Sequence, residues 1–187
     1  MNDLAFDDAT HTYTVDGRVV PSVTQVLDDA GLVDKRWYTD EACLRGRYVD
    51  VATELHDAGK LDWSKVPAQY VPYVEAWVLF RKESQIQILG QKERRYSAIY
   101  HYAGECDKRV LWGGETGILD IKTGARPAWY ALQLAGYIGL QPVATGRIGV
   151  VLKPNGGYSM KHYSYDPGDW DAFRGALAVC HWKRNHK

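Results

Sequence analysis

The chain has 187 residues, 45% of them hydrophobic, and its 23 basic and 23 acidic residues leave no net charge. This is enough apolar material for one core, and it excludes both a disordered chain and a protein coated in positive charge. The first residues are acidic where a secretion signal would be basic and then apolar, and the longest apolar run, 129–140, is far short of the roughly 20 residues that span a membrane. Three scattered cysteines, Cys43, Cys106 and Cys180, suggest free thiols in a reducing cytoplasm.

The N-terminal segment has the pattern of a hairpin followed by a short helix. Residues 11–20 alternate around Asp16-Gly17, a strong hairpin signal, and Ser22 is suited to cap the helix that follows. We expect one domain, with residues 1–36 as an appendage and residues 37–187 as its core.

The rest of the chain alternates between helical and strand patterns. Two helices, over about 38–58 and 67–84, precede successive strands within 86–122, which glycines at 90, 104 and 113–114 separate. A largely apolar helix, a strand pair and an amphipathic final helix follow. This order predicts an α/β fold, with a central mixed sheet of about four strands flanked by helices.

Three charged side chains should converge on one hairpin. Its two-residue turn is Gly113-Gly114, which tolerates the positive φ angles that such turns need. That turn sets the register and places Asp107 directly opposite Asp120. Lys122 projects to the same face, because strand side chains alternate with a period of two.

Two carboxylates placed opposite each other need compensating charge. A divalent cation that prefers oxygen ligands, Mg²⁺ or Mn²⁺, is the simplest source, and Lys122 could then hold or help deprotonate an attacking water. The structural alternative is a surface hairpin in which Lys122 bridges Asp120 or Glu105. The triplet alone does not decide between the two.

Gln133 and Tyr137 are four residues apart and therefore share one face of an otherwise apolar helix. Buried polar groups need partners there. One alternative is again structural, with Gln133 capping a strand carbonyl and Tyr137 reaching the surface.

Together these residues form three motifs in a fixed order: Gly104-x-x-Asp107, Asp120-Ile121-Lys122-Thr123-Gly124 and Gln133-x-x-x-Tyr137. The set resembles the RecB-like branch of the PD-(D/E)XK nucleases, particularly phage-encoded exonucleases, over roughly residues 45–137. The resemblance implies a restriction-endonuclease-like core and metal-dependent hydrolysis of DNA phosphodiester bonds, with exonuclease action in phage DNA recombination or processing in the host cytoplasm.

The resemblance also implies a role for each motif residue. Asp107, Asp120 and the backbone carbonyl of Ile121 would bind Mg²⁺ or Mn²⁺, and Lys122 would be the catalytic lysine. The glutamine and tyrosine of the third motif would support the active site and contact DNA. Besides DNA, the implied partners are further copies of the chain in a homo-oligomer and a phage single-strand annealing protein.

One position departs from the family pattern. Such nucleases usually carry a histidine ligand in a G-x-x-V-H segment, and the matching segment here ends in Asp50. Asp50 could replace the histidine as an oxygen ligand, with Glu54 one helical turn further on the same face. Equally, the departure could mark a catalytically weakened relative that binds DNA or proteins on the same scaffold.

Because the net charge is zero, we expect DNA to bind along a narrow basic track. The candidates are Arg94, Arg95 and Lys108 beside the site, with Arg47 on the preceding helix.

Overall fold

The computed structural model describes residues 3–141 and 143–186. Its helices are α1 (Val23–Asp29), α2 (Asp40–Asp57), α3 (Val71–Ser84), α4 (Tyr130–Ile138) and α5 (Pro167–Asn185), with 3-10 turns η1 (Lys35–Trp37) and η2 (Trp63–Lys65). The strands are β1 (Leu4–Asp7), β2 (Thr12–Val15), β3 (Arg18–Val20), β4 (Gln87–Ser97), β5 (Tyr102–Trp112), β6 (Glu115–Lys122), β7 (Gly146–Leu152) and β8 (Tyr158–Tyr163).

The described strands form two sheets. A small antiparallel sheet has the order β1-β2-β3, and a larger one has the order β4-β5-β6-β7-β8. Only the β6–β7 pair of the larger sheet is parallel, with α4 as the connection between them. The predicted α/β fold with a mixed, helix-flanked sheet is confirmed, and the sheet has five strands where about four were expected.

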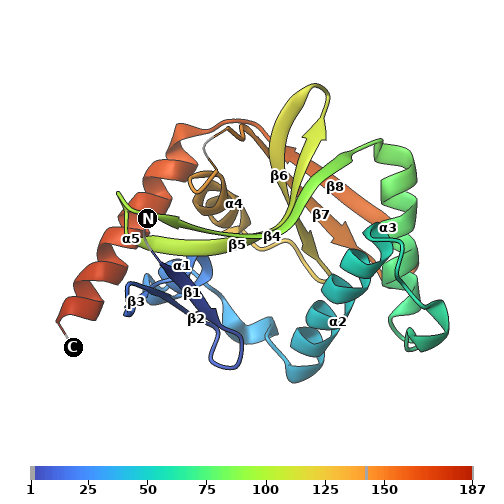
Figure 1. Cartoon of the computed structure of the whole chain (residues 1–187), viewed down its shortest axis with the longest axis horizontal. Coiled ribbons are helices and arrows are strands. Elements are labelled where there is room, and N and C mark those ends of the chain that lie inside the picture. Colours follow the sequence, from blue (N-terminus) through green and yellow to red (C-terminus); the bar gives the residue numbers. More distant parts are fainter. Residues whose placement is uncertain (1–2, 142, 187) are drawn as a thin grey trace.

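Helices cover the large sheet on both faces (Figure 1). Ile118 and Leu119 are neighbours on β6, and both are fully buried, but they belong to different apolar clusters. Leu119 packs with Trp77 and other residues of α2 and α3, whereas Ile118 packs with Leu134 and other residues of α4. The core is therefore two layers, one on each side of the strand that carries Asp120.

The strand pattern at residues 86–97 was predicted incorrectly. Gly90 does not separate two strands: β4 runs through it, with a register shift between Ile88 and Gly90. Such a bulge lets a strand bend without ending. Gly104 likewise lies inside β5.

The N-terminal segment is built into the same core. The Asp16-Gly17 hairpin and the Ser22 cap form as predicted, and β1 adds a strand that the short LAFD segment did not reveal. The backbone N–H of Ala103 donates to the carbonyl of Pro21 at 2.9 Å, which docks the start of α1 on β5. None of the helices in the described ranges combines the length and apolar character that crossing a membrane requires.

Candidate active site

The site begins where the β5–β6 pairing ends. The two strands pair as the Gly113-Gly114 turn predicts, down to Lys108 opposite Leu119. The next position in this register sets Asp107 opposite Asp120. There, Oδ2 of Asp107 accepts a hydrogen bond from the backbone N–H of Ile121 at 2.8 Å. The hairpin thus fixes one oxygen of Asp107 and leaves Oδ1 for other partners.

Asp120 is held by two neighbours. Its Oδ2 lies 2.7 Å from Nζ of Lys122, and the hydroxyl of Tyr130 donates to the same oxygen at 2.7 Å and to the Asp120 carbonyl at 2.9 Å. Burial raises the pKa of Asp120, and Lys122 opposes the rise. Burial alone would lower the pKa of Lys122, but Asp120 and Asp107 raise it.

The alternative of a surface hairpin bridged by Lys122 is correct for the bridge and wrong for the surface. Lys122 does bridge Asp120, but Asp120 is only 3% exposed, so the pair does not belong to a surface hairpin. A buried carboxylate, a lysine and a second carboxylate from the neighbouring strand converge here.

The position of Tyr130 on α4 depends on Gly149 of β7, the strand that pairs with β6. A side-chain carbon added to Gly149 of β7 would lie 2.6 Å from the Tyr130 ring, closer than such atoms approach. Gly149 therefore lets the ring approach β7 closely while its hydroxyl bonds Asp120.

A second group of carboxylates surrounds Lys92 of β4. Its Nζ lies 2.5 Å from Oδ2 of Asp50, 3.4 Å from Oδ1 of Asp107, 3.6 Å from Oε1 of Glu54 and 3.7 Å from Oε1 of Glu105. Both carboxylates that α2 was expected to offer therefore reach the site, and Asp107 links them to Asp120.

Four carboxylates surround the single ammonium group of Lys92. Burial and the nearby Asp107 raise the pKa of Asp50 to about 6, although Lys92 opposes the rise. Burial alone would lower the pKa of Lys92, but Asp107 and Asp50 raise it above its ordinary value. Within the described residues, the buried Oδ1 of Asp50 has no hydrogen-bond partner.

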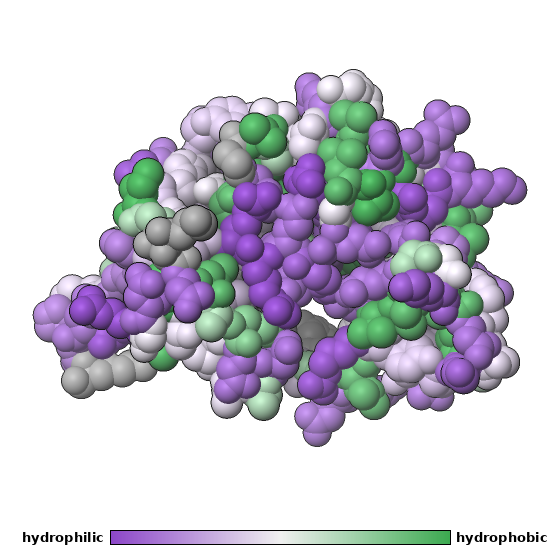
Figure 2. Space-filling model, viewed as in Figure 1, coloured by the Kyte–Doolittle hydropathy of each residue, from purple (hydrophilic) through white to green (hydrophobic). Residues whose placement is uncertain are grey.

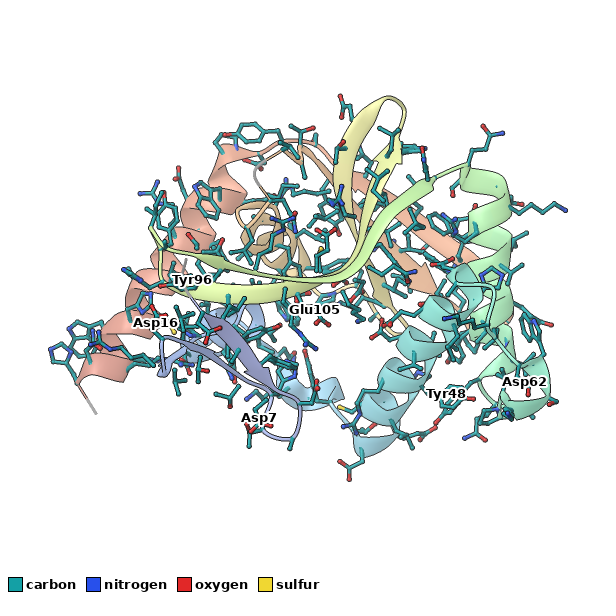
Figure 3. All side chains as sticks on the ribbon, viewed as in Figure 1. Asp7, Asp16, Tyr48, Asp62, Tyr96 and Glu105 are labelled. Atoms are coloured by element: carbon teal, nitrogen blue, oxygen red, sulfur yellow. The ribbon has the colours of Figure 1, made fainter. Side chains whose placement is uncertain are left out.

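A cavity of about 160 Å³ opens beside these groups, between the N-terminal sheet, α1, α4 and strands β4 and β5. Lys92, Glu105, Asp107 and Tyr137 line it. Figure 2 shows this face as mainly hydrophilic and hollowed between the N-terminal sheet and α2. Glu105 lies on β5 above that hollow (Figure 3).

Gly104, the first residue of the Gly104-x-x-Asp107 motif, allows close packing at the cavity wall. A side-chain carbon there would lie 2.9 Å from Val23 of α1 and 3.2 Å from Tyr137 of α4. The glycine thus brings both helices close to Asp107.

Gln133 and Tyr137 share one face, as predicted, and their partner comes from α1. Nε2 of Gln133 donates to the hydroxyl of Thr24 at 3.0 Å and to that of Tyr137 at 3.5 Å. The alternative in which Gln133 caps a strand carbonyl is wrong. Oε1 of Gln133 is buried and has no partner among the described residues, so it can still accept a hydrogen bond.

The expectation for Lys108 is also wrong. Lys108 is fully buried, with its Nζ 3.0 Å from Oδ2 of Asp57 and 2.5 Å from Oε1 of Gln91. Because it is next to Asp107 on the strand, its side chain points to the opposite face. It cannot contact DNA in this fold.

The remaining predicted DNA contacts differ in their charge environment. Arg94 forms an ion pair with Glu105 at 2.5 Å, and Arg95 forms one with Glu93 at 3.1 Å. The positive charge of each arginine is therefore already paired with a carboxylate. Arg47 is exposed, with no ion pair among the described residues.

Arg45 also has no acidic partner in the described ranges, and it lies next to the site. Its Nε donates to the hydroxyl of Thr123 at 3.3 Å, directly after Lys122 in the chain. The structure therefore places Arg45 of α2, and not Lys108, on a basic rim beside the site.

The oxygen donors suit a hard divalent cation. No group of three or more His, Cys, Asp or Glu side chains in the described residues is arranged to hold a metal ion. Mg²⁺ keeps several waters and needs only one or two carboxylates, so Asp107, Asp120 and the Ile121 carbonyl fit it or Mn²⁺. Positive charge is already stabilised at one of these carboxylates, because the ammonium of Lys92 lies 3.4 Å from Oδ1 of Asp107.

Sequence reasoning missed three residues that shape the site: Lys92, Tyr130 and Thr24. Tyr130 carried a usable signal, because a tyrosine early in an apolar helix needs a partner for its hydroxyl. Lys92 and Thr24 lie in segments whose distance from Asp107 depends on the tertiary fold.

No protein-family model and no curated protein matches the sequence. Among solved structures, the chain is similar to the alkaline exonuclease LHK-Exo from Laribacter hongkongensis, with a TM-score of 0.46, 13% identity, and coverage of 88% of this chain and 92% of that one. For LHK-Exo in complex with dAMP, the TM-score is 0.44 and the sequence identity 13%, and the alignment covers 88% of this chain and 87% of that one. For SSO0001, the TM-score is 0.33 and the sequence identity 14%, and the alignment covers 74% of this chain and 71% of that one.

Proposed function

We propose that the chain is a metal-dependent nuclease that hydrolyses DNA phosphodiester bonds. The observation that carries the proposal is the junction of β5 and β6. There, Lys122 lies 2.7 Å from buried Asp120, and Asp107 is fixed beside them by the N–H of Ile121. The three charged groups come from a register that the hairpin turn determines.

Each residue has a distinct task in this proposal. A bound Mg²⁺ or Mn²⁺ would supply positive charge that stabilises the phosphate oxygens in the transition state. Asp107, Asp120 and the Ile121 carbonyl would hold the ion, and Tyr130 keeps Asp120 in place. Lys122 would orient the attacking water and stabilise it as it loses a proton.

The wall that Gln133 and Tyr137 form with Thr24 would orient the DNA. The free acceptor of Gln133 is buried within this wall, and Tyr137 lines the cavity next to Asp107. Arg45 and Arg47 would contact phosphates on the outer rim. The motif resemblance supports exonuclease action in phage DNA recombination or processing, with a homo-oligomer and a single-strand annealing protein as partners.

A DNA-binding relative without cleavage activity is the second candidate. The observation that favours it is Lys92, because an ammonium group already neutralises part of the carboxylate cluster without a metal ion.

Cleavage of end-labelled linear DNA and closed circular DNA, with Mg²⁺ or Mn²⁺, tests the proposal. We expect Lys122→Ala to abolish cleavage while most DNA affinity remains, because a positioned catalytic group acts mainly in the transition state. Lys82→Ala, at an exposed lysine of α3, is the matched control.

Full activity of Lys122→Ala would overturn the assignment. Efficient cutting of the closed circle would change it to an endonuclease. DNA binding by the wild type without cleavage in either metal would favour the second candidate.

A further inference from the structure

Lys92 has an unusual backbone conformation for its place in the fold. Five non-glycine residues in the described ranges have positive φ, and four of them lie in turns or at a helix end. Lys92, with a φ of 52°, is the one within a strand. Such a conformation is unfavourable for a side chain with a Cβ, and it tends to persist where surrounding contacts hold it.

The contacts that hold Lys92 are carboxylates from two elements, β5 and α2. The β4–β5 register, which pairs Gln91 with Lys108 and Glu93 with Cys106, sets Lys92 opposite Asp107. From there its ammonium reaches Asp50 and Glu54 on α2 and Glu105 on β5, all within 3.7 Å.

One oxygen of Asp107 connects this cluster to the proposed metal site. Oδ2 of Asp107 is occupied by the N–H of Ile121, so Oδ1 is the oxygen left for a cation. Oδ1 is also the oxygen that faces Lys92, at 3.4 Å. A divalent ion on Oδ1 and the ammonium would repel each other at this separation.

We propose that Lys92 is a built-in competitor of the metal ion: its ammonium must withdraw from Asp107 when the ion binds, and it therefore weakens metal binding. This inference rests on the proposed function. Lys92 is a positioning residue that acts on the ion through the shared carboxylate, and Asp50, its nearest partner, anchors it in the metal-free protein.

Calorimetric titration of the chelator-treated protein with Mn²⁺, without DNA, tests the inference. Lys92→Met keeps much of the length of the side chain and removes its charge, so we expect Mn²⁺ to bind about tenfold more tightly, equivalent to roughly 1.4 kcal/mol. Lys92→Arg retains the charge and should keep an affinity close to that of the wild type. Lys82→Met is the surface control.

Thermal unfolding provides a second readout. Without metal, Lys92→Met should melt at a lower temperature than the wild type, because the carboxylates lose their counter-charge. Added Mn²⁺ should raise the melting temperature of Lys92→Met by more than that of the wild type, because stabilisation grows with the ratio of ligand concentration to Kd. Lys92→Gln replaces Lys92→Met if the latter does not fold.

The possible failures are distinguishable. Unchanged or weaker Mn²⁺ binding by the uncharged variants would overturn the competition while leaving the nuclease proposal intact. Tighter binding by Lys92→Arg as well would show that charge is not the cause, and would also overturn it. Absence of Mn²⁺ binding in both the wild type and the uncharged variants would overturn both proposals.

Discussion

Removing the hydroxyl of Tyr130 should destabilise the protein by about 2 kcal/mol. The Tyr130 ring is fully buried, and its hydroxyl donates to Oδ2 of Asp120 at 2.7 Å and to the Asp120 carbonyl at 2.9 Å. A buried acceptor that loses its donor costs about 1–3 kcal/mol. Lys122 still contacts Oδ2 in Tyr130→Phe, so we expect a value near the middle of that range.

Urea unfolding with Tyr163→Phe as the control measures this effect. Tyr163 packs against the Tyr130 ring with centroids 5.9 Å apart, and its hydroxyl makes no hydrogen bond to any described residue. The control should stay within about 0.5 kcal/mol of the wild type. Tyr130→Phe should also melt roughly 4–8 °C lower, given a shift of about 2–4 °C per kcal/mol for a chain of this size. Equal stability of the two variants would refute the role of the hydroxyl.

Three further predictions follow from the site and its surroundings. Gly149→Ala should cost about 1–3 kcal/mol, because the new methyl group would lie 2.6 Å from the Tyr130 ring; wild-type stability in urea unfolding would contradict this. Arg45→Ala should weaken duplex DNA binding and make the salt dependence shallower by about 0.9 in log–log slope, measured by fluorescence anisotropy at several salt concentrations; an unchanged slope would remove Arg45 from the rim. Burial raises the pKa of Cys106 to about 12 and that of Cys180 to about 11, from an ordinary value of 9.0. The buried thiols therefore contribute their full stability below pH 9.0, and this contribution is lost as the pH rises towards 11–12. In the folded protein, a thiol reagent should therefore label exposed Cys43 first, and rapid labelling of all three cysteines at pH 8 would contradict the burial.

The central pair of carboxylates could be predicted because it depends on local geometry. The Gly113-Gly114 turn specifies the register, and the alternation of side chains then places Asp107, Asp120 and Lys122. The same alternation would have placed Lys108 on the other face. The expectation of a DNA contact there failed because it grouped basic residues by sequence distance alone.

Lys92 could not be predicted by the same route. A lysine in a polar strand is usually solvated, and nothing local shows that a bulge at Gly90 and a positive φ bring it opposite Asp107. Two of its other partners, Asp50 and Glu54, are about forty residues earlier on α2. Only the packing of α2 beside the sheet reveals the cluster.

The docking of α1 fixes when the site can be completed during synthesis. Leu27 of α1 packs in one cluster with Phe173 of α5, and Thr24 bonds Gln133 within the site. At roughly 5–20 residues per second, a ribosome that has made Leu27 needs on the order of 10–30 s more to reach Phe173. Until then the apolar face of α1 lacks its contacts with Phe173 and the other buried residues of α5. The packing that holds α1, and with it the contact of Thr24 with Gln133, is therefore complete only after the last helix is made.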